Sequence, residues 1–293
     1  MPAQLLTRLP EAEWQARERL HQERVAVFAD PYLERRSRGA KHPVEDFLFT
    51  YYTQKPGQLL RWHPGAGVLL QGAAQHRAGW KYYTEDDGDA RVDPLRFLTE
   101  RRDAVDFARL ILARTAARPA QFGCFGLHEW AMTYRSAVNG VRHEYLDLRL
   151  GAAGTDDVVE SARIRCTHFD AFRFYTPQAV PLNELTPTRE SQRDLEQPGC
   201  LHANMDLYKW AYKLTPLLPS EIVMDCFELS WRIRSMDMRA SPYDLAPWDY
   251  APIRIETTEG KAEYVRLQRG FAEESQVLRG RLLDALDHAL ENV

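Results

Sequence analysis

Apolar and charged residues interleave at helical intervals over several long stretches of this chain. Between Pro10 and Pro31 this pattern predicts a helix, and the second proline is expected to end it because proline cannot donate the helical hydrogen bond. The same periodicity predicts further helices over residues 94–114, 203–214, 220–238 and 258–290.

Shorter stretches indicate β-structure. Residues 80–83 and the acidic turn 85–89 indicate a small β excursion, and the alternating residues 145–150 and 164–174 favour strands near Asn139-Gly140, a hairpin dipeptide. Residues 178–198 are polar and proline-bearing, which predicts a long loop. We therefore expect a mainly α fold with a small central β element (α+β), as one helical domain over residues 1–293.

Composition narrows the class of protein. The chain has 38 basic and 42 acidic residues and a net charge of −4, so no basic excess marks it as a general nucleic-acid binder. Its N-terminus lacks an apolar signal-peptide core, and no run of apolar residues is long enough to span a membrane. The four cysteines form no C-x-x-C pair and lack structural zinc spacing. A reducing, cytoplasmic location is expected.

The segment from residue 197 to 214, Q-P-G-C-L-H-A-N-M-D-L-Y-K-W-A-Y-K-L, is unusually dense in polar and aromatic groups. On a helix His202 and Asp206 stand one above the other, because they are four residues apart. They can share a metal ion, or Asp206 can orient His202 as a general base. Alternatively, His202 and Asn204 satisfy free amides at the helix start.

Two other segments have the same style, and we expect all three to converge on one site. In C-T-H-F-D-A-F-R-F-Y, residues 166–175, His168 and Asp170 would share a face if the segment is a strand, with Phe169 beside them. The alternative is a strand edge whose His and Asp bond to neighbouring backbone groups.

The third segment, G-C-F-G-L-H-E-W at residues 123–130, brings two titratable neighbours. His128 and Glu129 diverge by about 100° on a helix, so one is the functional candidate and the other supports it. Desolvation beside Trp130 favours Glu129 as an acid–base group, whereas a structurally paired glutamate is the alternative. Phosphate-loop, dinucleotide, serine-hydrolase and H-E-x-x-H motifs are absent from the sequence.

Long motifs also carry a family resemblance. They are K-H-P-V-E-D-F-L-F-T-Y-Y (41–52), R-W-H-P-G-A-G (61–67), G-C-F-G-L-H-E-W-A-M (123–132), C-T-H-F-D-A-F-R-F-Y-T-P (166–177), L-H-A-N-M-D-L-Y-K-W-A-Y-K-L (201–214) and M-R-A-S-P-Y-D-L (238–245). Over almost the whole chain they resemble a bacterial family, common in actinobacteria, often catalogued as 3-methyladenine DNA glycosylases. The resemblance implies a DNA-repair hydrolase that cleaves N-glycosidic bonds, with DNA as partner and no cofactor.

Such an enzyme needs an aromatic pocket for a flipped base and a carboxylate that activates water or stabilises the oxocarbenium ion. The candidate catalytic residues are then Glu129, Asp170 and Asp206. The candidate substrate-binding residues are His128, Trp130, Phe169, Asn204, Tyr208, Lys209 and Trp210.

The residues by themselves leave two alternatives open. One is a metal-dependent enzyme acting on a small molecule, with His168, Asp170, His202 and Asp206 as ligands of Fe, Mn or Zn and Glu129 as acid–base group. The other is a non-catalytic protein that binds a small molecule through these polar segments.

Overall fold

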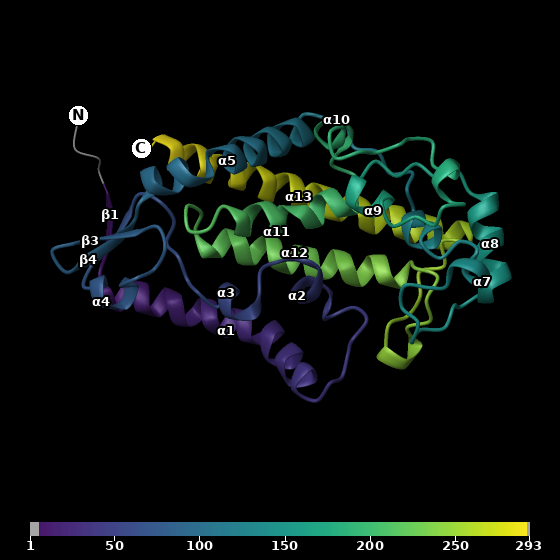
Figure 1. Cartoon of the computed structure of the whole chain (residues 1–293), viewed down its shortest axis with the longest axis horizontal. Helices are drawn as coiled ribbons and strands as arrows, with labels where there is room; N and C mark the ends of the chain where they lie inside the picture. The colour runs from purple at the N-terminus through teal and green to yellow at the C-terminus, as the bar shows by residue number, and fades with distance from the viewer. Residues whose placement is uncertain (1–5, 292–293) are drawn as a thin grey trace. The chain divides into compact units, whose positions relative to one another are not determined.

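The structure is a computed structural model that describes residues 6–291. Within this range the chain is mainly α-helical with one small sheet, which confirms the expected fold class (Figure 1). The Cα positions divide into two compact units. Unit 1 comprises Met1–Ala113, Leu207–Glu228 and Leu278–Val293, and unit 2 comprises Arg114–Asp206 and Leu229–Val277.

The sheet belongs to unit 1 and has the strand order β1-β2-β4-β3. Strand β1 (Thr7–Leu9) is parallel to β2 (Val68–Leu70), and β4 (Asp89–Val92) is antiparallel to both β2 and β3 (Tyr83–Asp86). The β3–β4 hairpin confirms the β excursion expected there. Asp87 and Gly88 form its turn at φ values of 45° and 85°, which Asp-Gly tolerates well.

The expected mid-chain strands are wrong. Residues 145–150 and 164–174 form no strand, and each contributes only one isolated bridge, Leu148 with Tyr243 and Ile164 with Asn183. A strand requires a partner ladder along its length, and local alternation cannot supply one. Phe169–Phe172 instead make one helical turn, α9, directly after His168.

The first helix, α1 (Glu11–Ser37), continues through Pro31, so its expected end there is also wrong. Pro31 cannot donate a hydrogen bond to the carbonyl of Val27, four residues earlier. The Val27 side chain is 67% exposed, so it lies on the solvent side of the helix. Water can satisfy that carbonyl, while Val25, Ala29 and Tyr32 keep the opposite face buried.

The remaining helices of unit 1 are short apart from α5. They are α2 (Phe47–Tyr51), α3 (Pro56–Leu59), α4 (Ala74–Arg77) and α5 (Pro94–Ala116), which is kinked at Arg101 and whose last residues belong to unit 2. Figure 1 shows α4 next to strands β3 and β4.

Unit 2 is built from short helices and loops. Its elements are α6 (Leu127–Ala131), α7 (Ser136–Asn139), α8 (Gly151–Ser161), α9, α10 (Gln192–Leu195) and the 3-10 helices η1 (Val180–Leu182) and η2 (Ala246–Trp248). Residues 178–198 thus contain η1, α10 and irregular backbone between them.

Three long helices contribute residues to both units: α11 (Leu201–Lys213), α12 (Ser220–Arg239) and α13 (Thr258–Glu291). The periodicity-based predictions for these helices are confirmed to within a few residues. No helix within residues 6–291 combines the length and apolar character needed to cross a membrane.

Candidate metal centre

Helices α6 and α12 meet through two buried pairs of opposite charge. On α12, Arg234 and Asp237 are three residues apart and therefore lie on one face. The Nε2 atom of His128 lies 3.0 Å from Oδ2 of Asp237, and the Arg234 guanidinium donates to Glu129 at 2.9 Å. Both neighbours on α6 are therefore engaged by the same helix face.

Asp237 has a second oxygen that is not satisfied. Its side chain is fully buried, and within residues 6–291 its Oδ1 atom has no hydrogen-bond partner. Leaving a buried carboxylate oxygen unpaired is costly, so this oxygen offers an unused ligand position.

A second buried group of donors surrounds His168. Its Nε2 atom lies 3.2 Å from Oε1 of Glu196 and 3.4 Å from Oδ2 of Asp206, which is on α11. All three residues are at most 2% exposed. Although these distances are short, neither ring nitrogen of His168 has a partner within hydrogen-bond geometry in the described residues. The donor atoms of the three residues nevertheless lie within 4.8 Å of one another.

His202 lies beside both histidines. Its ring centroid is 4.5 Å from that of His128, edge to face, and 5.4 Å from that of His168. The donors of His128, His202 and Asp237 lie within 4.8 Å of one another, as do those of His168, Glu196 and Asp206. We call the first set the open group and the second the closed group.

The shortest donor separations in the two groups lie in the range found between ligands of one metal ion. Donors bound at 2.0–2.2 Å from one ion are separated by about 3.0 Å in octahedral and about 3.4 Å in tetrahedral geometry. The measured contacts are 3.0 Å in the open group and 3.2 and 3.4 Å in the closed group. Two imidazoles with one carboxylate, and one imidazole with two carboxylates, suit Fe, Mn or Zn.

The three histidines have different proton affinities. Burial disfavours a charged His128, but the Asp237 carboxylate outweighs it and keeps the pKa of His128 well above the ordinary value of 6.5. Burial likewise opposes a charged His168, and Asp206 and Glu196 nevertheless raise its pKa to about 9. Burial, then the positive charge of His128, holds the pKa of His202 well below 6.5. His202 is therefore neutral near pH 7 and could serve as a ligand.

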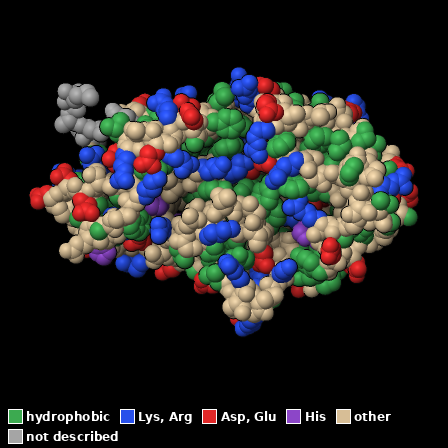
Figure 2. All heavy atoms as spheres, in the orientation of Figure 1, with side chains coloured by type: hydrophobic (Ala, Val, Ile, Leu, Met, Phe, Trp, Pro, Cys, Tyr) green, Lys and Arg blue, Asp and Glu red, His purple; other side chains and the backbone are tan. Residues whose placement is uncertain are grey.

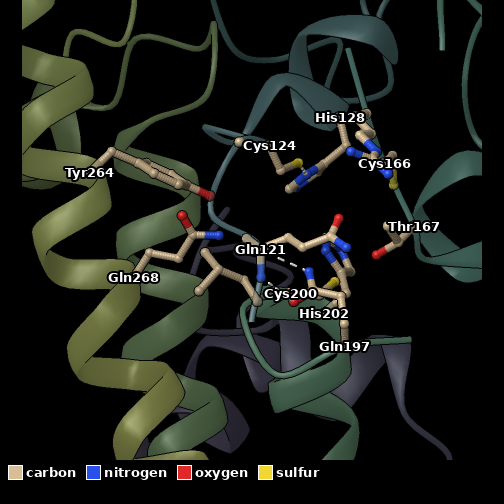
Figure 3. A pocket seen from close by; sticks show the side chains of 13 residues that line it. Gln121, Cys124, His128, Cys166, Thr167, Gln197, Cys200, His202, Tyr264 and Gln268 are labelled. Carbon is tan, nitrogen blue, oxygen red and sulfur yellow. Dashed lines mark hydrogen bonds between the residues drawn. The ribbon is translucent and has the colours of Figure 1, made fainter. Parts of the chain in front are cut away.

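A cavity of about 140 Å³ adjoins the open group (Figure 3). His128 and His202 line it, and Tyr264 and Gln268 of α13 form the side across from them in Figure 3. Of the described residues that line this cavity, none belongs to the closed group. The open group alone therefore has space for a further ligand.

All three segments singled out by their composition reach this cavity. Cys124, Cys166 and Cys200, one from each segment, line it as free thiols. The Sγ atom of Cys124 lies 3.4 Å from Nδ1 of His128 and helps to fix the orientation of that ring. Burial raises the pKa of the Cys166 thiol to about 11, so it is protonated near pH 7.

The turn before α11 is held tightly against this cavity. A Cβ at Gly199 would lie 2.2 Å from the carbonyl oxygen of Gln121, so only glycine permits this approach. Gln197 reinforces it, because its side chain accepts from the Gln121 amide at 2.8 Å and the Gly199 amide at 2.7 Å. This packing places His202 at the start of α11.

The structure separates His128 from Glu129 and His168 from Asp170. Glu129, the expected acid–base residue, is held by Arg234, and Asp170 forms ion pairs with Arg173 at 3.1 Å and Arg189 at 3.6 Å. The shared strand face expected for His168 and Asp170 is wrong, because Asp170 lies on helix α9. His202 and Asp206 are both on α11, but they fall into different donor groups.

Several expected substrate-binding residues have packing roles. In unit 2 the Trp130 indole donates to the Ala240 carbonyl and the Asn204 amide to that of Pro198, both at 2.9 Å. Phe169 lies 5.0 Å below the Arg189 guanidinium. In unit 1 the remaining three pack against neighbouring rings or against one another: Tyr208 on Tyr52 and Phe227, Trp210 on Phe107, and Lys209 over Trp210.

Sequence reasoning missed Glu196 and Asp237. Asp237 is a charged residue among the apolar positions of α12, and Glu196 immediately precedes the dense segment at residue 197. Each is an acidic residue at a buried position, where charged residues are rarely found without a partner. Such a position is a usable but weak signal of a functional residue.

No protein-family model, curated protein or solved structure matches this chain. The family resemblance of its motifs therefore stays a prediction, and the geometry of the site carries the functional argument.

Proposed function

We propose that this protein is a metal-dependent enzyme that acts on a small molecule, with its catalytic ion held by His128, His202 and Asp237. The observation that carries the proposal is the combination of donor spacing and access: only the open group adjoins the cavity. Three protein ligands with an open position are the pattern of catalytic metal sites, whereas closed ligand sets are structural.

The donor chemistry narrows the ion and its use. Two histidines and one carboxylate are typical of Fe, Mn or Zn, and an ion there would polarise a substrate or activate a water molecule. His168, Glu196 and Asp206 would hold a second ion that supports the fold and the position of His202. The unpaired Oδ1 of Asp237 is explained if it too faces the catalytic ion.

The cavity limits the substrate. Its volume of about 140 Å³ is close to that of an engineered cavity of about 150 Å³ that holds benzene. One polar anchor is available, because the Gln268 carbonyl oxygen is buried and has no hydrogen-bond partner within residues 6–291. We therefore favour a compact substrate that carries a hydrogen-bond donor.

The glycosylase prediction keeps its own support in the family resemblance. Its three expected catalytic carboxylates, however, are already paired. Glu129 pairs with Arg234, and Asp206 pairs with His168. Asp170 pairs with Arg173 and Arg189. Of its aromatic candidates, Trp130 and Phe169 belong to unit 2 and Tyr208 and Trp210 to unit 1. A non-catalytic binding protein would use the same cavity without turnover.

Elemental analysis of the purified full chain tests the proposal. We expect about one or two transition-metal ions per chain, one for each three-donor group. His202→Ala should remove the ion of the open group, and Asp237→Asn should do so with little change in side-chain volume. His143→Ala is the matched control, because His143 belongs to the same unit but to neither donor group.

Folded protein that contains no transition metal as purified, and takes up none when the metal is supplied, would overturn the proposal. Release of free 3-methyladenine from alkylated DNA by such metal-free protein, abolished in Asp206→Asn, would instead establish the glycosylase.

A further inference from the structure

Unit 1 contains a larger cavity of quite different chemistry, which we call the basic cavity. Its volume is about 440 Å³, within the range of small-molecule sites. It is lined by the loops before and after α3, the start of the β3 hairpin, the kink of α5 and the end of α11: Thr53, Gln54, Gln58, Arg61, His63, Trp80, Lys81, Tyr82, Arg101, Tyr212, Lys213, Thr215 and Pro216.

The described lining holds four cationic side chains and no carboxylate. The cations are Arg61, Lys81, Arg101 and Lys213. Within residues 6–291, neither Arg61 nor Arg101 forms an ion pair, while Lys81 pairs with Glu100 outside the cavity at 2.8 Å. On the face drawn in Figure 2, blue Lys and Arg side chains and red Asp and Glu side chains are both spread over the surface.

Aromatic rings orient these cations without neutralising them. The guanidinium of Arg61 lies 5.5 Å from the Trp80 ring, that of Arg101 lies 5.7 Å from Phe97, and the Lys81 ammonium lies 4.5 Å from Tyr82. At exposed positions such contacts are weak. Arg101 is also anchored at the kink of α5, where its Nη2 atom donates to the Lys213 carbonyl at 3.4 Å.

Neutral polar groups complete the lining. Burial, then the charge of Arg77, lowers the pKa of His63 to about 3, so His63 is uncharged near pH 7. Its Nδ1 atom is 2.9 Å from the Tyr83 hydroxyl, which fixes the ring. The positive charge of the cavity therefore comes from arginine and lysine, which retain it at any physiological pH.

We propose that the basic cavity binds a small organic phosphate of nucleotide size, held at its phosphate by Arg61 and Arg101. Arginine forks match phosphate geometry, and rings at the cavity wall can cover an aromatic or sugar portion. A single phosphate-bearing molecule fits better than a nucleic acid, because the four cations line one cavity and the chain as a whole has a net charge of −4. This site is independent of the metal centre.

Calorimetric titration of the full chain with AMP, adenosine and inorganic phosphate tests this proposal. We expect AMP to bind with a micromolar to low millimolar Kd, phosphate more weakly, and adenosine at least tenfold more weakly than AMP. Arg61→Ala and Arg101→Ala should each weaken AMP binding about tenfold or more, and Arg61→Lys should weaken it less.

Arg102→Ala is the matched control. Arg102 neighbours Arg101 on α5, but it pairs with Asp106 and does not line the cavity. Two results would overturn the proposal. One is an equal loss of AMP affinity in Arg101→Ala and Arg102→Ala, and the other is no AMP binding up to about 10 mM. An oligothymidylate that binds more than tenfold tighter than AMP would overturn it too, in favour of single-stranded nucleic acid.

Discussion

The open and closed groups contain the same kinds of donor atom, yet they differ in access to the cavity. In the open group two of the three members, His128 and His202, line the cavity, whereas no member of the closed group does. Donor chemistry decides which ions can bind, and access decides what a bound ion can do. On the proposed function, the open group therefore carries out the chemistry and the closed group supports the fold.

The largest effect that sharpens this comparison is expected from Asp237→Ala. The substitution leaves His128 buried without its carboxylate, which should destabilise the fold by about 3–5 kcal/mol. Urea unfolding measures this loss. Asp237→Asn should destabilise less, because an amide still accepts a hydrogen bond, while binding metal equally poorly. If Asp237→Ala were as stable as wild type, the buried pair between His128 and Asp237 would not stabilise the open group.

The closed group should make the free energy of unfolding of metal-free protein depend on pH. The folded pKa of His168 is raised to about 9 from 6.5, so its stabilisation is complete below pH 6.5 and lost as pH rises through about 9. The loss amounts to about 3 kcal/mol, to order of magnitude. Urea unfolding between pH 6 and 10 after chelation measures it. His168→Gln should flatten the decline, and an unchanged decline would contradict this role.

Within the open group, His202 should respond to pH in the opposite direction to His168. Because the folded pKa of His202 is lowered, its contribution is present above pH 6.5 and lost as pH falls. One proton gives a slope of at most about 1.4 kcal/mol per pH unit. His202→Gln should reduce the slope of unfolding free energy between pH 6.5 and 5. The His143→Gln variant is the control, because His143 lies outside the donor groups and burial lowers its pKa to about 4. It shows how much such a histidine contributes to the slope.

The smallest effect is expected from Cys124→Ala. Cys124 touches the Nδ1 atom of His128 but lies outside the donor set, so its loss should weaken metal binding about tenfold, the lower end for such supporting groups. Competition with a chromophoric chelator measures the affinity. Cys124→Ser should retain most of it. A complete loss of metal in Cys124→Ala would mean that the thiol itself is a ligand.

Sequence periodicity predicted the long helices well, because a helix that buries one face repeats its apolar residues at regular intervals within its own segment. It failed where the outcome depended on partners elsewhere in the chain. The alternation of residues 164–174 had no neighbouring strand to pair with, and α1 passes through Pro31 because its other face is buried.

The same limit applies to the candidate site. Local composition marked His128, His168, His202 and Asp206, which the structure brings together in unit 2. It could not show that Glu129 pairs with Arg234, more than one hundred residues later, or that Asp237 and Glu196 complete the donor sets. Partners that distant in sequence leave at most a weak local signal in a single chain.

The alternating charges between α6 and α12 also make the assembly of unit 2 selective. His128 faces Asp237 while its neighbour Glu129 faces Arg234, so the order of signs on one helix mirrors that on the other. A shift of α6 along α12 in one direction would bring Glu129 to Asp237, and a shift in the other would bring His128 to Arg234, and each sets like charges together away from water. Misassembled forms of unit 2 are thereby penalised before any ligand arrives.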